Sequence, residues 1–137
     1  MAFSLTPAGS ARHVLLLRDS LPRETVARLG SVYESFLAPN REFKQLTSDW
    51  QQGSGNGTRE RLQAVHGEVG GVIERAAAEQ PRFATYQGRF DRALEAFRGG
   101  DDDALAKPLS GSYHDVWMEL HEDLLATLGR ERTDADE

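Results

Sequence analysis

The sequence predicts an all-α protein: a single bundle of five or six helices preceded by a short extended N-terminal segment. Over most of the 137 residues, apolar side chains recur three or four positions apart, which is the spacing of an amphipathic helix. Prolines and glycines divide the chain into segments of helical length. A composition of 39% hydrophobic and 28% charged residues is typical of a folded protein, and the length suits one domain.

The N-terminal end is expected to hold an extended segment, residues 1–6, and a first helix from Pro7 to Arg18. Thr6 is a suitable cap for that helix, and Pro7 suits its first position. The run from Val14 to Leu17 places four consecutive apolar side chains around the helix, so packing one face on the bundle cannot bury them all. We therefore expect a homodimer formed through this first helix.

Two further helices and a loop are expected between Ser20 and residue 57. The first has Ser20 as its N-cap and an apolar face made of Val26, Leu29, Tyr33, Phe36 and Leu37. We expect Ala38-Pro39 to break or kink it, because a residue before proline disfavours helical dihedral angles. A short helix should then run from Arg41 to about Trp50, followed by a flexible, glycine-rich loop over residues 51–57.

The second half of the chain predicts two long helices and then a third. Thr58 is expected to cap the first, whose apolar face is Leu62, Val65, Val69, Val72, Ile73 and Ala76. After a boundary at Gln80-Pro81, the second carries the stripe Phe83, Tyr86, Phe90, Leu94 and Phe97 and stops at Gly99-Gly100.

An acidic turn at residues 101–103 should introduce a short segment before Pro108. The last long helix is then expected from about Ser112 to Leu128, ended by Gly129. The bundle domain is therefore predicted over residues 7–129, followed by a mobile acidic tail over residues 130–137.

Composition and charge exclude several classes of function. The chain has no cysteine, which excludes disulfides, thiolate metal sites and cysteine nucleophiles. Its longest strongly apolar run has four residues, so no membrane span or signal peptide is expected and the cytoplasm is the default location. Residues 101–137 carry three basic and eleven acidic side chains, and no basic patch for nucleic acid or an anionic membrane is evident.

Several stretches resemble one family of transcriptional regulators. Phe3-Ser4-Leu5-Thr6-Pro7-Ala8-Gly9 looks like the end of a winged-helix DNA-binding domain of the MarR or PadR type. Similarity to the helical C-terminal region of actinobacterial winged-helix regulators is carried by Phe43-Lys44-Gln45-Leu46 with Asp49-Trp50, by Pro81-Arg82-Phe83 and by residues 112–124. The helix-turn-helix and most of the wing are missing, so the resemblance implies an effector-sensing or dimerisation module without its DNA reader.

The histidines are the sharpest candidates for chemistry. His114 and His121 lie two turns apart on one face of the last helix, and His66 lies beside the apolar face of its own helix. If these two helices pack together, the three imidazoles could converge on a divalent metal or a haem. Hydrogen-bonded structural histidines, and contacts to an organic ligand, are the alternatives.

Any organic ligand is expected between the helix that carries His66 and the last helix. Gly67, Gly70 and Gly71 weaken the first of these helices by about 2–3 kcal/mol, which either close packing or room for a ligand would offset. The candidate ligand-binding residues are His66, Tyr113, His114, Trp117, His121 and Trp50. The candidates for holding an anionic group at the rim are Arg41, Lys44 and Arg82.

The sequence favours a non-enzymatic regulatory domain over an enzyme. The carboxylates of the last helix, Asp115, Glu119, Glu122 and Asp123, lie on different faces and form no catalytic pair. The predicted function is effector sensing, dimerisation or both, with no cofactor and no direct contact with nucleic acid. The alternative is a small metal- or haem-binding helical-bundle protein that uses His66, His114 and His121.

Overall fold

A computed structural model describes residues 21–53 and 57–130 of the chain. They form the helices α2 (Arg23–Gln51), α3 (Thr58–Glu79), α4 (Thr85–Arg98), α5 (Asp103–Ala106) and α6 (Tyr113–Leu128), with a 3₁₀-helix, η1 (Pro81–Ala84), before α4. No strand occurs in this part of the chain, so the predicted all-α class is confirmed. Residues 1–20, with the expected extended segment and dimer-forming helix, lie outside the described residues, as do residues 131–137 of the expected tail.

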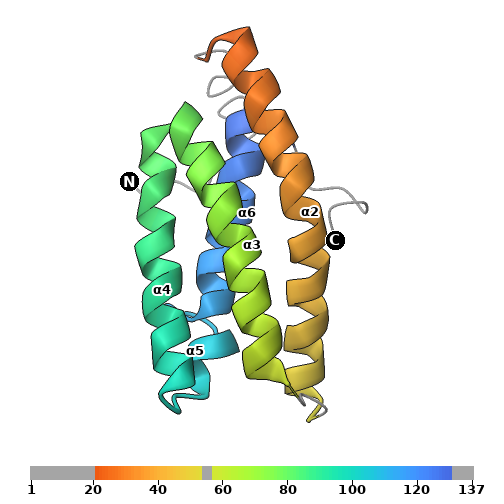
Figure 1. Cartoon of the computed structure of the whole chain (residues 1–137), viewed down its shortest axis with the longest axis vertical. Helices are drawn as coiled ribbons and strands as arrows, with labels where there is room; N and C mark the ends of the chain where they lie inside the picture. Colours follow the sequence, from red (N-terminus) through yellow and green to blue (C-terminus); the bar gives the residue numbers. More distant parts are fainter. Residues whose placement is uncertain (1–20, 54–56, 131–137) are drawn as a thin grey trace, which may run out of the picture.

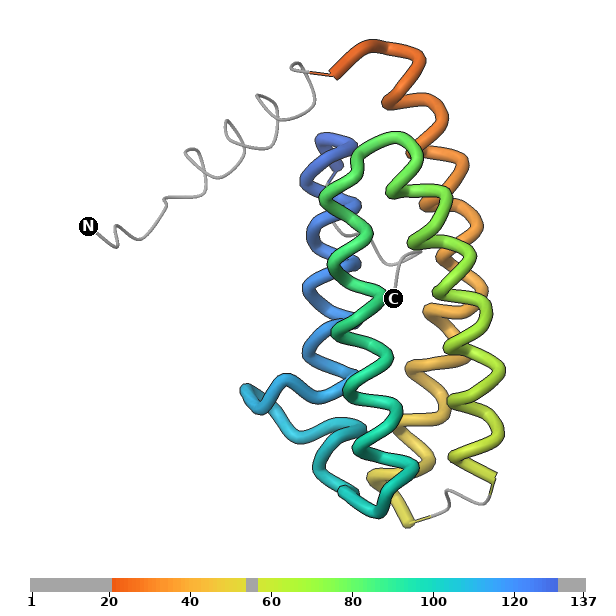
Figure 2. Tube along the Cα trace, turned by 60° about the vertical axis from the view of Figure 1, so that its left-hand side comes forward, coloured from red at the N-terminus to blue at the C-terminus, as the bar shows by residue number. Residues whose placement is uncertain are grey.

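The four long helices lie along one axis and alternate in direction along the chain (Figure 1). Each packs on the next, and α6 returns to pack on both α4 and α2, which closes the bundle (Figure 2). The short helix α5 lies at the end of the bundle where α4 stops and α6 begins. None of the described helices combines the length and apolar character needed to cross a lipid bilayer.

Helix α2 corrects one expectation, because it continues through Pro39 from Arg23 to Gln51 instead of forming two helices. The upper part of α2 is inclined to its lower part in Figure 1, so the chain bends without breaking. Proline within a helix removes one backbone hydrogen bond and clashes with the preceding turn, at a cost of about 3 kcal/mol.

Packing against α6 offsets this cost. Phe36 and Phe43, on either side of Pro39, lie with their ring centroids 5.3 and 4.4 Å from that of Trp117. Asn40, next to the proline, accepts a 2.9 Å hydrogen bond from the indole Nε1 of Trp117. Tertiary contacts of one helical face thus outweigh the local preference of the Ala38-Pro39 dipeptide.

The ends of α4 and α6 agree with the expected stop signals. Gly100 and Gly129 adopt positive φ angles of 105° and 70°, which L side chains rarely adopt. The chain then turns back on each helix: Asp101 N donates to Ala96 O at 3.0 Å, and Arg130 N donates to Leu125 O at 2.9 Å. At the start of α3 the expected cap is wrong, because Gly57 occupies the N-cap position and Thr58 is the first helical residue.

The interior is filled by aromatic side chains from α2, η1, α4 and α6, against which α3 packs aliphatic side chains such as Leu62, Val65 and Val69. The largest fully buried ones are Trp117, Tyr33, Tyr113, Phe36, Phe43, Phe83, Phe90 and Phe97. Two glycines of α3 do not admit a neighbouring helix, since a Cβ atom at Gly67 or Gly71 would meet nothing within 4 Å. At Gly70 the nearest atom would be the side-chain oxygen of Gln87 on α4, at 3.3 Å.

Candidate functional site

His66 connects three helices through two hydrogen bonds. Its Nδ1 lies 2.9 Å from the hydroxyl oxygen of Tyr113 on α6, and its Nε2 lies 2.9 Å from Oδ1 of Asp91 on α4. A carboxylate only accepts, so Nε2 carries the proton and the tyrosine hydroxyl donates to Nδ1. Burial, with a smaller contribution from Asp91, raises the pKa of Tyr113 far above its ordinary value, which keeps this donor protonated.

The other two histidines lie in separate surroundings. His121 is buried, with its Nε2 2.9 Å from the hydroxyl oxygen of Tyr33 and its ring 5.2 Å from that of Phe36. His114 is half-buried and stacks on Phe43 at 6.1 Å. Within residues 21–53 and 57–130, no three histidine or carboxylate side chains form a group that could hold a metal ion, so the metal or haem alternative stays a prediction.

The remaining predicted ligand contacts are spread across the bundle. Tyr113 and Trp117 are at most 1% exposed and pack among other aromatic rings. Trp50 lies near the C-terminal end of α2, where its ring meets the edge of Phe97 at 5.3 Å. The surface has two hollows, one between α4, α5 and the start of α6 and one on α4 and α6, and none of the six predicted ligand-binding residues lines either of them. The binding role of these six residues stays a prediction.

Of the three predicted rim cations, Arg82 holds a carboxylate of its own chain. Its guanidinium donates to both oxygens of Asp123 at 2.7 Å and to the hydroxyl of Thr127 at 2.7 Å. Tyr86 also donates to Asp123, at 2.7 Å. These contacts bind η1 and α4 to α6, so Arg82 fastens helices together in this structure. Arg41 and Lys44 lie on the exposed face of α2.

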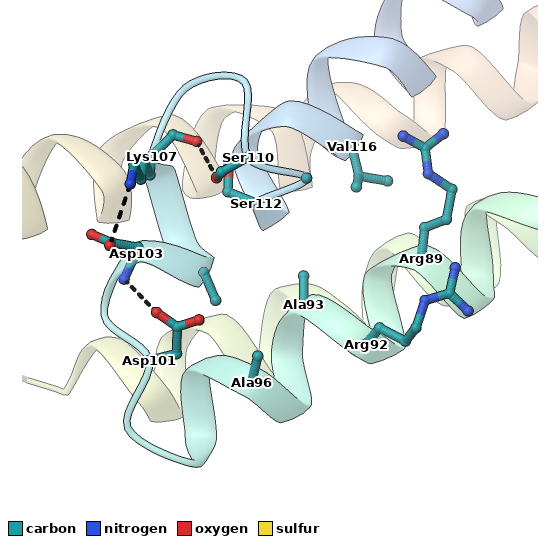
Figure 3. A pocket seen from close by; sticks show the side chains of 12 residues that line it. Arg89, Arg92, Ala93, Ala96, Asp101, Asp103, Lys107, Ser110, Ser112 and Val116 are labelled. Atoms are coloured by element: carbon teal, nitrogen blue, oxygen red, sulfur yellow. Dashed lines mark hydrogen bonds and ion pairs between the residues drawn. The ribbon is translucent and has the colours of Figure 1, made fainter.

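A pocket of about 470 Å³ lies between α4, α5 and the start of α6 (Figure 3). We call it the α4–α6 pocket. Small side chains form its apolar floor: Ala93, Ala96, Ala104 and Val116. Arg89 and Arg92 extend from α4 at one end of the pocket. The other end carries Asp101, Asp103 and Lys107, of which the last two form an ion pair at 3.8 Å.

A second, shallower hollow of about 420 Å³ lies on α4 and α6, with Arg89 in the wall of both hollows. Its other lining residues are Tyr86, Met118, Glu119 and Glu122. Arg89 forms an ion pair with Glu119 and places its guanidinium 5.7 Å from the ring centroid of Tyr86. With two carboxylates and one cation, this hollow is acidic, whereas the neighbouring end of the α4–α6 pocket is basic.

The loop that closes the α4–α6 pocket is held by Asp115. Its Oδ2 accepts from the backbone N–H groups of Ser110 at 2.8 Å and Gly111 at 3.0 Å, while Ser112 caps α6. Partial burial raises the pKa of Asp115, but hydrogen bonds from the backbone, those of Ser110 and Gly111 first, outweigh it and leave the pKa below its usual value. Next to this turn, Leu109 is 99% exposed with a φ of 58°.

Asp115→Ala is expected to lower the free energy of unfolding at neutral pH by about 1–2 kcal/mol, since two N–H groups lose their acceptor. Because the folded-state pKa is lowered, this contribution is fully present above the unfolded pKa of about 3.9 and disappears as the pH falls through the folded value. Denaturant unfolding across this pH range is the measurement. Asp102→Ala, an exposed matched control, should change little, and an equal loss from both variants would contradict the role of Asp115.

The candidate residues from the sequence, mostly histidines and aromatic side chains, do not include the pocket residues Arg89 and Arg92. The available signal was their spacing: Arg89, Arg92, Ala93 and Ala96 recur three or four positions apart and share one stripe of α4. Chemically, the pocket offers guanidinium groups, carboxylates and hydroxyls over an apolar floor. Comparison of the chain with models of protein families, with curated proteins and with solved structures found no match, so the resemblance to winged-helix regulators stays a prediction.

Proposed function

We propose that the chain is a non-enzymatic ligand-sensing domain, the effector-binding and dimerisation module of a winged-helix-type regulator, and that its effector binds in the α4–α6 pocket. The observation that carries this proposal is the pocket itself. Its volume of about 470 Å³ falls within the range of sites for small organic molecules. Its apolar floor with a few charged groups at the ends is the usual composition of such a site.

The character of the lining supports binding rather than catalysis. Its two hydroxyl side chains are engaged locally, since Ser110 donates to the backbone oxygen of Lys107 at 2.7 Å and Ser112 accepts from Asp115 N at 3.2 Å. No histidine lines the pocket, and its described residues include no nucleophile hydrogen-bonded to a base. The expected role is therefore recognition of a molecule that leaves unchanged.

The position of the pocket suits a sensor. Its walls come from α4, α5 and the loop before α6, so a bound molecule would join segments that are more than twenty residues apart. A ligand that binds the folded arrangement of these segments, and not a state in which they have separated, stabilises the folded arrangement by mass action. At a free ligand concentration of a hundred times the Kd, the stabilisation is about 2.7 kcal/mol. Fixing the start of α6 relative to α4 is then the event that a regulator could transmit.

The test is a thermal-unfolding screen of small metabolites on the full chain, followed by a variant that fills the pocket. Ala96→Phe places a large ring on the pocket floor, where Ala96 is only half-buried, and should abolish the increase in Tm that a bound metabolite causes. Ala84→Phe puts the same ring at an exposed position of η1 as the matched control and should keep the increase. Equal increases in both variants would place the binding site elsewhere and overturn the proposal.

A further inference from the structure

Two arginines of α4 share one end of the α4–α6 pocket. Arg89 and Arg92 are three positions apart on the helix, so their side chains are neighbours on its surface. Figure 3 places both guanidinium groups beyond Val116, away from the acidic end at Asp101 and Asp103. The lining of this pocket is thus divided by charge, with its two guanidinium groups at one end.

The two guanidinium groups differ in their partners. Arg89 forms an ion pair with the carboxylate of Glu119 on α6 and is 37% exposed, while Glu119 is 55% exposed. Arg92 is exposed and has no hydrogen bond or ion pair to any residue of the described part of the chain. One cation of the pair is therefore available, and the other is already in contact with an oxyanion.

We propose that this end of the pocket binds the oxyanion group of a small molecule, a carboxylate or a phosphate, between Arg89 and Arg92, and that Glu119 competes with it for Arg89. The inference rests on the proposed function and names the chemical class of its ligand. Guanidinium groups suit this class because their planar N–H donors match the two oxygens of a carboxylate or phosphate. The apolar floor at Ala93 and Ala96 then receives the rest of the ligand.

Displacement of Glu119 costs little. Ion pairs between side chains this exposed contribute little to stability, because water and salt screen them. A ligand oxyanion that contacts both Arg89 and Arg92 gains a second cation that Glu119 does not contact. At the other end, the carboxylates of Asp101 and Asp103 outnumber the one cation, Lys107, which is paired with Asp103, so this end disfavours a second anionic group and a ligand with one oxyanion group is preferred.

The experiment is an NMR titration of the full chain at low ionic strength, where charged contacts are least screened. The probes are inorganic phosphate, butyrate and butyramide, the last being the uncharged counterpart of butyrate. Phosphate and butyrate should shift the amide signals of residues 89–96, and butyramide should not. Shifts with phosphate but not with butyrate would assign the site to phosphate groups, and shifts with butyrate but not with phosphate would assign it to carboxylates. Either result supports binding of an oxyanion.

Variants test the roles of the individual side chains. Glu119→Gln removes the competing charge and should tighten binding about two- to fivefold. Arg92→Gln should weaken it about tenfold or more. Arg98→Gln, an exposed arginine on α4 outside the pocket lining, is the matched control and should change nothing. The thermal unfolding of each variant shows that it folds.

The inference is overturned if butyramide binds as well as butyrate, if Arg92→Gln binds the anions as tightly as the unchanged chain, or if Glu119→Gln does not tighten binding. It also fails if no anion shifts the pocket signals. In each case, a metabolite that raises the Tm of the unchanged chain but not of the Ala96→Phe variant would still support the proposed function. Failure of the oxyanion proposal can thus be told apart from failure of the proposed function.

Discussion

Replacing Trp117 by alanine is expected to lower the free energy of unfolding by about 3–5 kcal/mol, the largest effect of any single change considered. Trp117 is 1% exposed, and its ring lies 4.4 Å from that of Phe43 and 5.3 Å from that of Phe36. Alanine would leave a cavity where α2 meets α6. It would also remove the indole donor from Asn40, which is 2% exposed.

Denaturant unfolding followed by circular dichroism measures this loss, because the variant lacks a tryptophan that fluorescence would monitor. Met118→Ala is the matched control on the next position of α6, where the side chain is half-buried. It should cost far less than Trp117→Ala. Similar losses from the two variants would show that the aromatic centre does not hold α2 against α6.

Replacing His66 by leucine is expected to cost about 1–3 kcal/mol, although leucine is the more apolar side chain. The reason is the fully buried hydroxyl of Tyr113, whose hydrogen bond to His66 at 2.9 Å would be lost. The hydrogen bond to Asp91 would be lost as well. The Asp91 side chain is 54% exposed, so water can solvate its carboxylate in place of His66 and this loss costs little.

The double variant His66→Leu/Tyr113→Phe separates this explanation from a packing defect. Removal of both hydrogen-bonding partners leaves no unsatisfied buried hydroxyl, so the double variant should regain most of the stability lost in His66→Leu. Chemical denaturation of the four proteins gives the coupling free energy directly. Additive losses from the two changes would mean that the hydrogen bond contributes nothing to stability.

The helical class and most helix boundaries could be predicted because their signals are local. Gly100 and Gly129 turn the chain after α4 and α6 through positive φ angles that glycine adopts freely, and Pro81 marks the boundary after α3. The continuity of α2 could not be predicted in the same way. It depends on contacts of Phe36 and Phe43 with Trp117, which lies more than seventy residues further along the chain, and no pattern around Pro39 reports the energy of these contacts.

The candidate site was predictable only in fragments. The place of His66 beside an apolar face was visible in the sequence, but its partners Tyr113 and Asp91 depend on how α3, α4 and α6 align. Part of the lining of the α4–α6 pocket comes from α5 and from the loop held by Asp115, so the pocket depends on the path of both. That path is set by contacts between α4, α5 and α6, which the sequence does not reveal. The small residues of α4 could therefore predict a stripe of small side chains on its surface, but not that other segments would enclose it as a pocket.

The most direct measurement of where the effector binds is amide chemical-shift mapping with the metabolite that raises the Tm most. Binding in the α4–α6 pocket predicts that the largest shifts fall on residues 89–96 and 101–112 and reach the start of α6 at Ser112 and Val116. Largest shifts around His66, His114, His121 and Trp117, in the aromatic interior, would contradict the proposed site and favour a ligand held within the core.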